Sequence, residues 1–184
     1  KVDKIIGPGN IFVTAAKNKG LSFTLPEVGK TFKLGEAVCT ILAPKSSSYS
    51  ESNDYSIVLK VVYGNNSFLF TGDAEAVSEM EMVNGGLNLK ADVLKLGHHG
   101  SKTATVTNFL KAVNPKYAVI SVGEDNKYGL PSQSVMDRLK NDNIPVYRTD
   151  ESGTIVATSD GNTIKFNTKP GSYNPGNAQN SNTE

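Results

Sequence analysis

Three side chains with metal-binding chemistry occur in two short segments of this sequence. Asp73 follows a Thr-Gly pair, and the adjacent His98 and His99 follow a glycine. Imidazole and carboxylate are the usual protein ligands of Zn²⁺ and Mn²⁺, and one carboxylate can give an oxygen to each of two ions held about 3.5 to 4 Å apart. Such ions generate hydroxide at neutral pH and stabilise charge on a phosphoryl or acyl oxygen. These residue types are therefore suited to metal-dependent hydrolysis.

Each candidate also has a structural interpretation. An aspartate directly before a helix accepts a backbone N–H as an N-cap, so Asp73 needs no metal. Backbone carbonyls could satisfy both histidines, and His99 could form a hydrogen bond near a helix cap. Taken singly, each residue fits the structural role at least as well as the chemical one.

The elements around these residues are short strands and helices in alternation. Residues 67–71 and 93–96 are apolar and β-branched, which predicts strands that end just before Asp73 and the histidines. Residues 74–83 show helical spacing, and Gly85-Gly86 ends that helix. Polar side chains at strand ends are common in the sites of layered α/β folds.

The rest of the chain continues this alternation. Residues 64–66 predict a hairpin turn between strands 56–63 and 67–71, and Asp160-Gly161-Asn162 predicts another between 154–158 and 163–166. The same patterns predict further strands and helices: strands at 117–122 and 146–148, helices from near Thr103 to Val113 and at 132–141, a helix near 11–18, and strands near 21–25, 31–34 and 38–42. The pattern predicts an α/β or α+β layered fold.

Composition indicates one domain and a tail. The 184 residues suffice for one substantial core, which we assign to 1–169. Residues 170–184 are rich in Pro, Gly, Asn and Ser, which predicts a disordered tail or linker. The net charge of +1 gives no global field toward nucleic acid or membrane. No apolar run approaches the roughly 20 residues of a transmembrane helix.

In combination, the two segments resemble a known family. Residues 68–75 and 93–101 are similar to two consecutive motifs of the metallo-β-lactamase superfamily. Segments similar to the ComEC-like branch of that family, which includes hydrolase domains of bacterial DNA-uptake channels, follow in the same order: 53–59, 115–123, 126–129, 146–150 and 153–155. The resemblance covers roughly residues 31 to 166.

The resemblance implies a fold, a site and an activity. The fold would be the C-terminal half or more of an αββα sandwich. Asp73 would bridge two metal ions, Zn²⁺ or Mn²⁺ in an intact parent, and His98 would be a ligand that projects toward the same point. His99 would contact a ligand or a substrate phosphate, although the order of the two histidines stays open. The parent would be a phosphodiesterase or nuclease that acts on DNA outside the cytoplasm or after secretion.

The sequence departs from the family in two places. The family's His-x-Asp-x-Asp-His cluster is missing, since His98 and His99 are the only histidines. Leu130 stands where the branch has a histidine in Tyr-Gly-His-Pro-His. We therefore expect a fragment that binds metal weakly and is inactive alone, with an apolar face covered by a missing N-terminal half or a dimer. The alternatives are a non-catalytic binding or assembly module, and a relative of phosphocholine or teichoic-acid esterases.

A substrate contact is expected just after the histidines. Gly100 and Ser101 precede the helix predicted from near Thr103, so their N–H groups, the Ser101 hydroxyl and the Lys102 ammonium could bind an anionic phosphoester. Alternatively, Ser101 or Thr103 only caps that helix.

Overall fold

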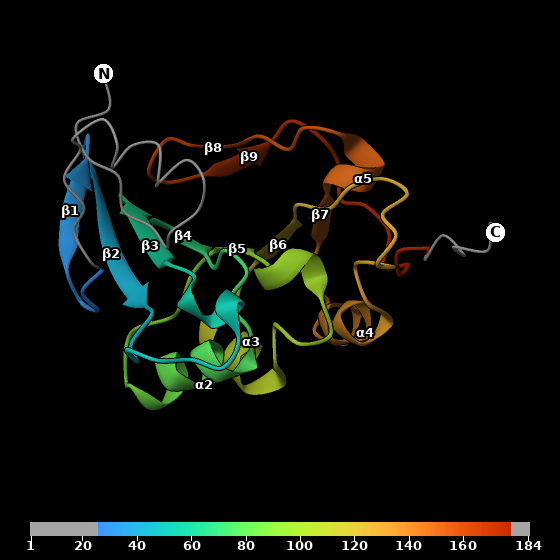
Figure 1. Cartoon of the computed structure of the whole chain (residues 1–184). Coiled ribbons are helices and arrows are strands. Elements are labelled where there is room, and N and C mark those ends of the chain that lie inside the picture. The colour runs from blue at the N-terminus through green and yellow to red at the C-terminus, as the bar shows by residue number, and fades with distance from the viewer. Residues whose placement is uncertain (1–25, 178–184) are drawn as a thin grey trace, which may run out of the picture.

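A computed structural model describes residues 26–177 and shows one mixed sheet with helices on one of its faces (Figure 1). The strands of the main sheet follow chain order: β1 (Thr31–Leu34), β2 (Ala37–Ala43), β3 (Val58–Tyr63), β4 (Asn66–Phe70), β5 (Val93–Lys95), β6 (Tyr117–Ile120) and β7 (Val146–Arg148). The helices are α2 (Ala76–Asn84), α3 (Thr107–Val113), α4 (Gln133–Asn141) and the short α5 (Thr149–Ser152), with 3₁₀ turns η1 (Ser52–Tyr55) and η2 (Gly97–Gly100). The predicted α/β class is confirmed.

The strand pairing changes from antiparallel to parallel at β4. Strands β1 to β4 pair antiparallel, whereas β4 to β7 pair parallel. Helices α2, α3 and α4 make the crossovers between consecutive parallel strands. Because such crossovers are right-handed and the strand order advances in one direction, all three helices lie on the same face.

The core lies between the sheet and these helices. Leu69, Leu94 and Ala118 point from the parallel strands toward the helices and are fully buried. Phe109 of α3 and Met136 of α4 meet them from the helix side. Leu69, Leu94 and Ala118 alternate along their strands with residues of the opposite face, because successive side chains of a strand point to opposite sides.

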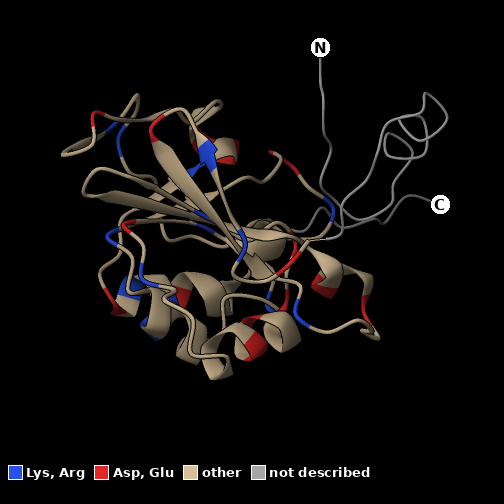
Figure 2. Cartoon of the chain, turned by 90° about the vertical axis from the view of Figure 1, so that its left-hand side faces the viewer, with Lys and Arg blue, Asp and Glu red and all other residues tan. Residues whose placement is uncertain are grey.

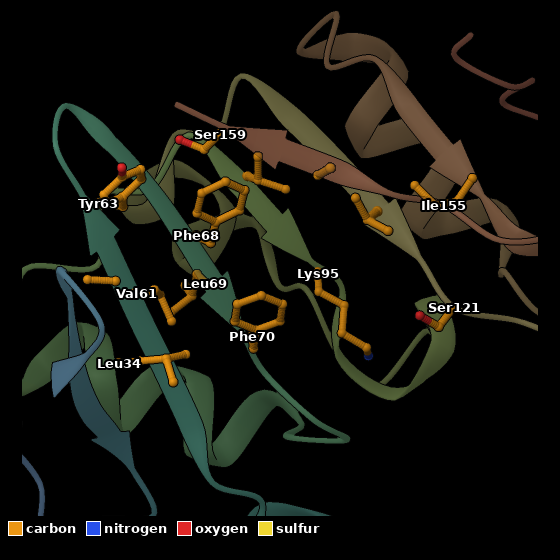
Figure 3. A pocket seen from close by; sticks show the side chains of 14 residues that line it. Leu34, Val61, Tyr63, Phe68, Leu69, Phe70, Lys95, Ser121, Ile155 and Ser159 are labelled. Atoms are coloured by element: carbon orange, nitrogen blue, oxygen red, sulfur yellow. The ribbon is translucent and has the colours of Figure 1, made fainter. Parts of the chain in front are cut away.

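The opposite face of the sheet is largely apolar and partly open. A second sheet of two strands, β8 (Ala157–Ser159) and β9 (Ile164–Phe166), crosses this face. The Phe166 ring stacks on Tyr147 of β7 with centroids 3.7 Å apart, and Gly161 O accepts from Asn65 N in the β3–β4 turn. Beside this hairpin is a groove of about 550 Å³, lined by Leu34, Val61, Phe68 and Phe70 among others (Figure 3). The apolar face expected from the sequence is therefore present among the described residues.

Charge is distributed evenly over the described chain. In Figure 2, acidic and basic positions both occur on the helices and loops, and neither forms a continuous band. This agrees with the net charge of +1. Within residues 26–177, no helix is long and apolar enough to cross a membrane.

The described residues confirm most predicted elements, with small shifts at their ends. The hairpin turn before β4 and the strands at 31–34 and 38–42 are present. The helix predicted from near Thr103 instead begins at Thr107. The helix expected at 11–18 and the strand at 21–25 lie outside the described residues.

The C-terminal segment departs from the expected tail over residues 170–177. Gly171 N donates to Val146 O at 2.7 Å, and the Tyr173 hydroxyl donates to Ile144 O at 2.9 Å. The buried Arg148 guanidinium donates to the carbonyl oxygens of Ser172 and Asn174. Composition suggested disorder because few residues here are apolar, but backbone carbonyls and one tyrosine suffice to hold the segment against β7.

Candidate metal centre

The candidate residues meet at the carboxyl ends of three parallel strands. Phe70 of β4 pairs with Lys95 of β5, so the segments that follow, with Asp73 on one and the histidines on the other, leave the sheet side by side. Ser121 follows β6, the next strand across. Layered α/β folds commonly place sites at such an edge.

Hydrogen bonds to backbone carbonyls join the first two loops. The Thr71 hydroxyl donates to Lys95 O at 2.7 Å, and His98 N donates to Gly72 O at 3.2 Å. A Cβ on Gly97 would lie 2.6 Å from Ala74 O, so only glycine permits this approach. The packing of the loops fixes the position of Asp73 relative to the histidines.

Both histidines adopt left-handed backbone conformations. His98 has φ 45° and ψ 46°, and His99 has φ 56° and ψ 26°. For residues with a side chain, such conformations cost on the order of 1 kcal/mol or more each, and they cluster at functional sites. Two in succession indicate that the surrounding structure holds this turn in place.

His99 is oriented toward Asp73. Its Nδ1 lies 2.6 Å from Ser121 O, and a carbonyl can only accept, so Nδ1 carries the proton. In the neutral ring this leaves the Nε2 lone pair free, and Nε2 lies 3.5 Å from Asp73 Oδ1. That separation is long for an N–H···O hydrogen bond, but it matches two ligands that share one ion through bonds of about 2.1 Å.

His98 is oriented by a different partner. Its Nδ1 lies 2.7 Å from Glu75 Oε1, and the same oxygen accepts a hydrogen bond from Asn53 Nδ2 at 2.9 Å. Its other neighbours, Asn53 Nδ2 at 3.5 Å and Thr103 Oγ1 at 3.4 Å, are more distant. The structure thus places His99, rather than the favoured His98, beside Asp73.

All five site residues predicted from the sequence line one hollow of about 470 Å³: Asp73, His98, His99, Ser101 and Lys102. Asp73 and His98 both line the hollow, and their convergence on one ion stays a prediction. Leu130 also lines the hollow, so the position where the branch has a histidine faces the site but offers no ligand atom.

The loop that carries Ser101 differs from the prediction. Residues 101–106 precede α3 as a loop, so Ser101 lies away from the N-terminus of that helix. Its hydroxyl contacts Thr103 within the loop and caps no helix. The buried Glu79 carboxylate instead accepts the N–H groups of Thr105 and Val106 at 2.6 and 2.8 Å. The predicted anion site at a helix N-terminus is therefore wrong, although Ser101 and Lys102 do face the hollow.

Asp73 does not cap α2 either. The N-cap position is Glu75, and Asp54 Oδ1 accepts from the N–H groups of Glu75 and Ser78 at 3.1 and 3.2 Å. Asp73 is 44% exposed at its side chain and contacts His99 instead. The interpretation of Asp73 as a helix cap is therefore wrong, because Asp54 accepts the N–H groups at the start of α2.

Lys95 adds a positive charge between the two loops. Its ammonium donates to Leu96 O at 3.0 Å and Gly72 O at 3.4 Å, and its side chain lies at the Ser121 end of the open groove (Figure 3). Burial lowers the pKa of Lys95, and the nearby Asp73 carboxylate opposes that change. The sequence patterns predict no role for Lys95, Glu75 or Ser121. Only Glu75 lies within a segment that resembles a family motif, two residues after Asp73.

The described residues supply only part of a metal centre. Asp73 and His99 have the spacing of two ligands, but within residues 26–177 no group of three His, Cys, Asp or Glu side chains could hold an ion. A zinc site needs three or four protein ligands. The donor set of the described residues is therefore too small for a complete site.

Comparison with known sequences identifies the family. The sequence model of the metallo-β-lactamase superfamily matches residues 10–124. The chain belongs to the metallo-β-lactamase superfamily. The resemblance inferred from residues 68–75 and 93–101 is thereby confirmed, and members of this superfamily generally bind divalent metals.

Its curated relatives include a competence protein and a ComE operon protein. The chain is 38% identical over 141 residues to ComE operon protein 3 of Bacillus subtilis, with 77% of this chain and 18% of that protein covered. It is 42% identical over 115 residues to competence protein ComA of Neisseria gonorrhoeae, with 62% of this chain and 17% of that protein covered. The ComEC-like resemblance is confirmed, and the chain spans less than a fifth of either relative.

A solved structure shares the fold. CmlA, a diiron β-hydroxylase from Streptomyces venezuelae, superposes with a TM-score of 0.56 at 11% identity, over 79% of this chain and 38% of that chain. The likeness confirms a metallo-β-lactamase fold. Because a hydroxylase shares it, the fold alone does not specify hydrolysis.

Proposed function

We propose that this chain belongs to a metal-dependent phosphodiesterase domain of the ComEC-like type, whose substrate is DNA. The observation that carries the proposal is the distance of 3.5 Å between Asp73 Oδ1 and His99 Nε2, with His99 Nδ1 anchored on Ser121 O. A histidine ligand nearly always donates its other ring N–H to a carbonyl or carboxylate. An imidazole held this way beside a carboxylate is arranged to bind a cation.

The donor types favour Zn²⁺ or Mn²⁺. Asp73 and His99 would hold the ion, and His98 lines the same hollow. When bound, such an ion supplies an activated water and stabilises charge on phosphoryl oxygens. Further ligands would have to come from outside the described residues.

Ser101 and Lys102 are the substrate contacts that we propose. Both line the hollow with Asp73 and the histidines. An ammonium and a hydroxyl beside a metal site suit the anionic oxygens of a phosphoester, whereas they offer little to a neutral substrate. In the longer protein, we expect Lys102→Ala to weaken phosphodiester turnover and leave the melting temperature unchanged.

DNA as the substrate, and a location outside the cytoplasm, rest on the relatives. One of them is named a competence protein, and another is named for the ComE operon. A DNA-uptake protein meets DNA on the outer side of the membrane, so we propose that the domain works there or after secretion.

A non-catalytic binding or assembly module is the second candidate function. The apolar Leu130 in the wall of the hollow favours it, together with the small ligand set of the described residues. A third candidate, an esterase of phosphocholine or teichoic acid, uses the same site on another phosphoester. Assays of the longer protein on DNA and on choline phosphoesters distinguish the three.

Calorimetric titration of the 184-residue chain with Zn²⁺ and Mn²⁺ tests the site. We expect weak binding that falls by about tenfold or more in Asp73→Asn and in His99→Gln. The exposed Asp142→Asn serves as the matched control and should bind like the wild type. Binding that is unchanged in both site variants would contradict the proposed centre. We also expect no measurable phosphodiesterase activity from this chain alone, so robust turnover would overturn its description as a partial site.

A further inference from the structure

The two histidines are anchored by acceptors of different kinds. His99 Nδ1 faces a backbone carbonyl, that of Ser121, which no substitution of that side chain removes. His98 Nδ1 faces the side-chain carboxylate of Glu75 at 2.7 Å. The orientation of His98 therefore depends on the side chain of a single residue, Glu75, which a substitution can remove.

Glu75 is itself held in place. Its side chain is 15% exposed, and its Oε1 accepts from Asn53 Nδ2 at 2.9 Å as well as facing His98. Its backbone N–H donates to Asp54 Oδ1, which fixes the start of α2. A carboxylate restrained at both its backbone and its side chain can dictate where a neighbouring imidazole points.

The contact also dictates which nitrogen of His98 is protonated. An ionised carboxylate only accepts, so a distance of 2.7 Å requires a proton on Nδ1. The Asn53 amide nitrogen is a donor and cannot take that proton, and it lies 3.5 Å away. The tautomer of an imidazole is set by the hydrogen bond that its other nitrogen makes. Among the described residues, His98 Nε2 has no hydrogen-bond partner.

We propose that Glu75 is a positioning residue that holds neutral His98 in the Nδ1–H tautomer and presents its Nε2 lone pair to the hollow lined by Asp73 and His99. Both imidazoles then carry the proton on Nδ1 and leave Nε2 unprotonated. The use of that lone pair rests on the proposed function, but the tautomer does not.

Long-range ¹H–¹⁵N NMR of the imidazoles tests this on the 184-residue chain without metal. Spectra are recorded at increasing pH until the ring signals stop changing, so that the neutral rings are observed. A free imidazole favours Nε2–H, so protonated Nδ1 in His98 of the wild type is a result that solvent would not produce. His98 in the Nε2–H form in the wild type would overturn the proposal before any variant is made.

Variants then identify the cause. We expect Glu75→Ala to lose the Nδ1–H signal of His98, and Glu75→Gln to retain it because the amide oxygen still accepts. His99 should keep Nδ1–H in both, which shows that the turn is intact, and the exposed Glu124→Gln should change neither ring. Retention of Nδ1–H by His98 in Glu75→Ala would overturn the proposal.

Adding Zn²⁺ to the same samples separates this inference from the proposed function. If the tautomer follows Glu75 but the Nε2 signals do not respond to Zn²⁺, the positioning role stands and the metal centre fails. If Zn²⁺ shifts the Nε2 signal of His99 while His98 shows the Nε2–H tautomer, the metal centre stands and the role of Glu75 fails.

Discussion

Glu79 shows how one buried side chain can tie protein stability to pH. Its carboxylate lies on α2, fully buried, and accepts the N–H groups of Thr105 and Val106. Burial raises its pKa from the ordinary 4.5 to about 7, although these two N–H groups and the nearby Arg138 oppose the change. Because Glu79 holds the loop after the histidines, its charge state bears on the region around the site.

The raised pKa predicts a stability that falls as pH rises. Between pH 4.5 and about 7, folded Glu79 keeps a proton that the unfolded chain has released, so the free energy of unfolding decreases across this window. We expect a decrease of roughly 1 kcal/mol per pH unit, since one pKa unit corresponds to about 1.4 kcal/mol. Urea unfolding at pH 5, 6 and 7 measures it.

Glu79→Gln should remove most of that slope, because a glutamine does not titrate. The exposed Glu124→Gln should retain the slope of the wild type and controls for the lost formal charge. An equal slope in wild type and Glu79→Gln would show that another group produces the pH dependence.

At the scale of elements, the start of α2 is stabilised by Asp54 and not by Asp73. Asp54 is 2% exposed and accepts two N–H groups of α2, whereas Asp73 is half-exposed and caps nothing. We expect Asp54→Ala to lower the free energy of unfolding by about 1 to 2 kcal/mol and Asp73→Ala to change it by less than about 0.5 kcal/mol. Denaturant midpoints of the two variants measure the difference.

Asp54→Asn is the matched control for this prediction. Its side-chain oxygen can still accept from α2, so the loss should be smaller than in Asp54→Ala. A larger loss of unfolding free energy in Asp73→Ala than in Asp54→Ala would contradict the assignment of Asp54 as the cap.

At the scale of the molecule, residues 170–177 contribute to the stability of the sheet edge. They bring Tyr173 against the core and supply carbonyl acceptors to the buried Arg148. We expect truncation after Lys169 to cost roughly 2 kcal/mol or more, because part of a buried guanidinium then loses its acceptors. Thermal unfolding measures the loss.

Truncation after Asn177 is the control, since every described contact of this segment remains. We expect its melting temperature to stay close to that of the full chain. Equal melting temperatures for both truncations would show that residues 170–177 behave as the tail that composition suggested.

The order of strands and helices could be predicted from the sequence, because it depends on local patterns. Alternating apolar residues, the Gly64-Asn65-Asn66 turn and the helical spacing of Phe109, Leu110 and Val113 act over short stretches of chain. The placement of Asp73 and the histidines at strand ends followed from the same patterns. With the glycine-flanked motifs, it was enough to indicate the family.

Only the tertiary structure decided which side chains meet at those strand ends. Asp54 rather than Asp73 caps α2, and Glu79 rather than Ser101 satisfies the start of α3. His99 rather than His98 faces Asp73, because Ser121 O and Glu75 orient the two rings differently. These contacts join residues far apart in the chain, and their geometry depends on strand register and on the close approach at Gly97. Local sequence patterns carry no information on either, so the choice of partners appears only once the sheet has formed.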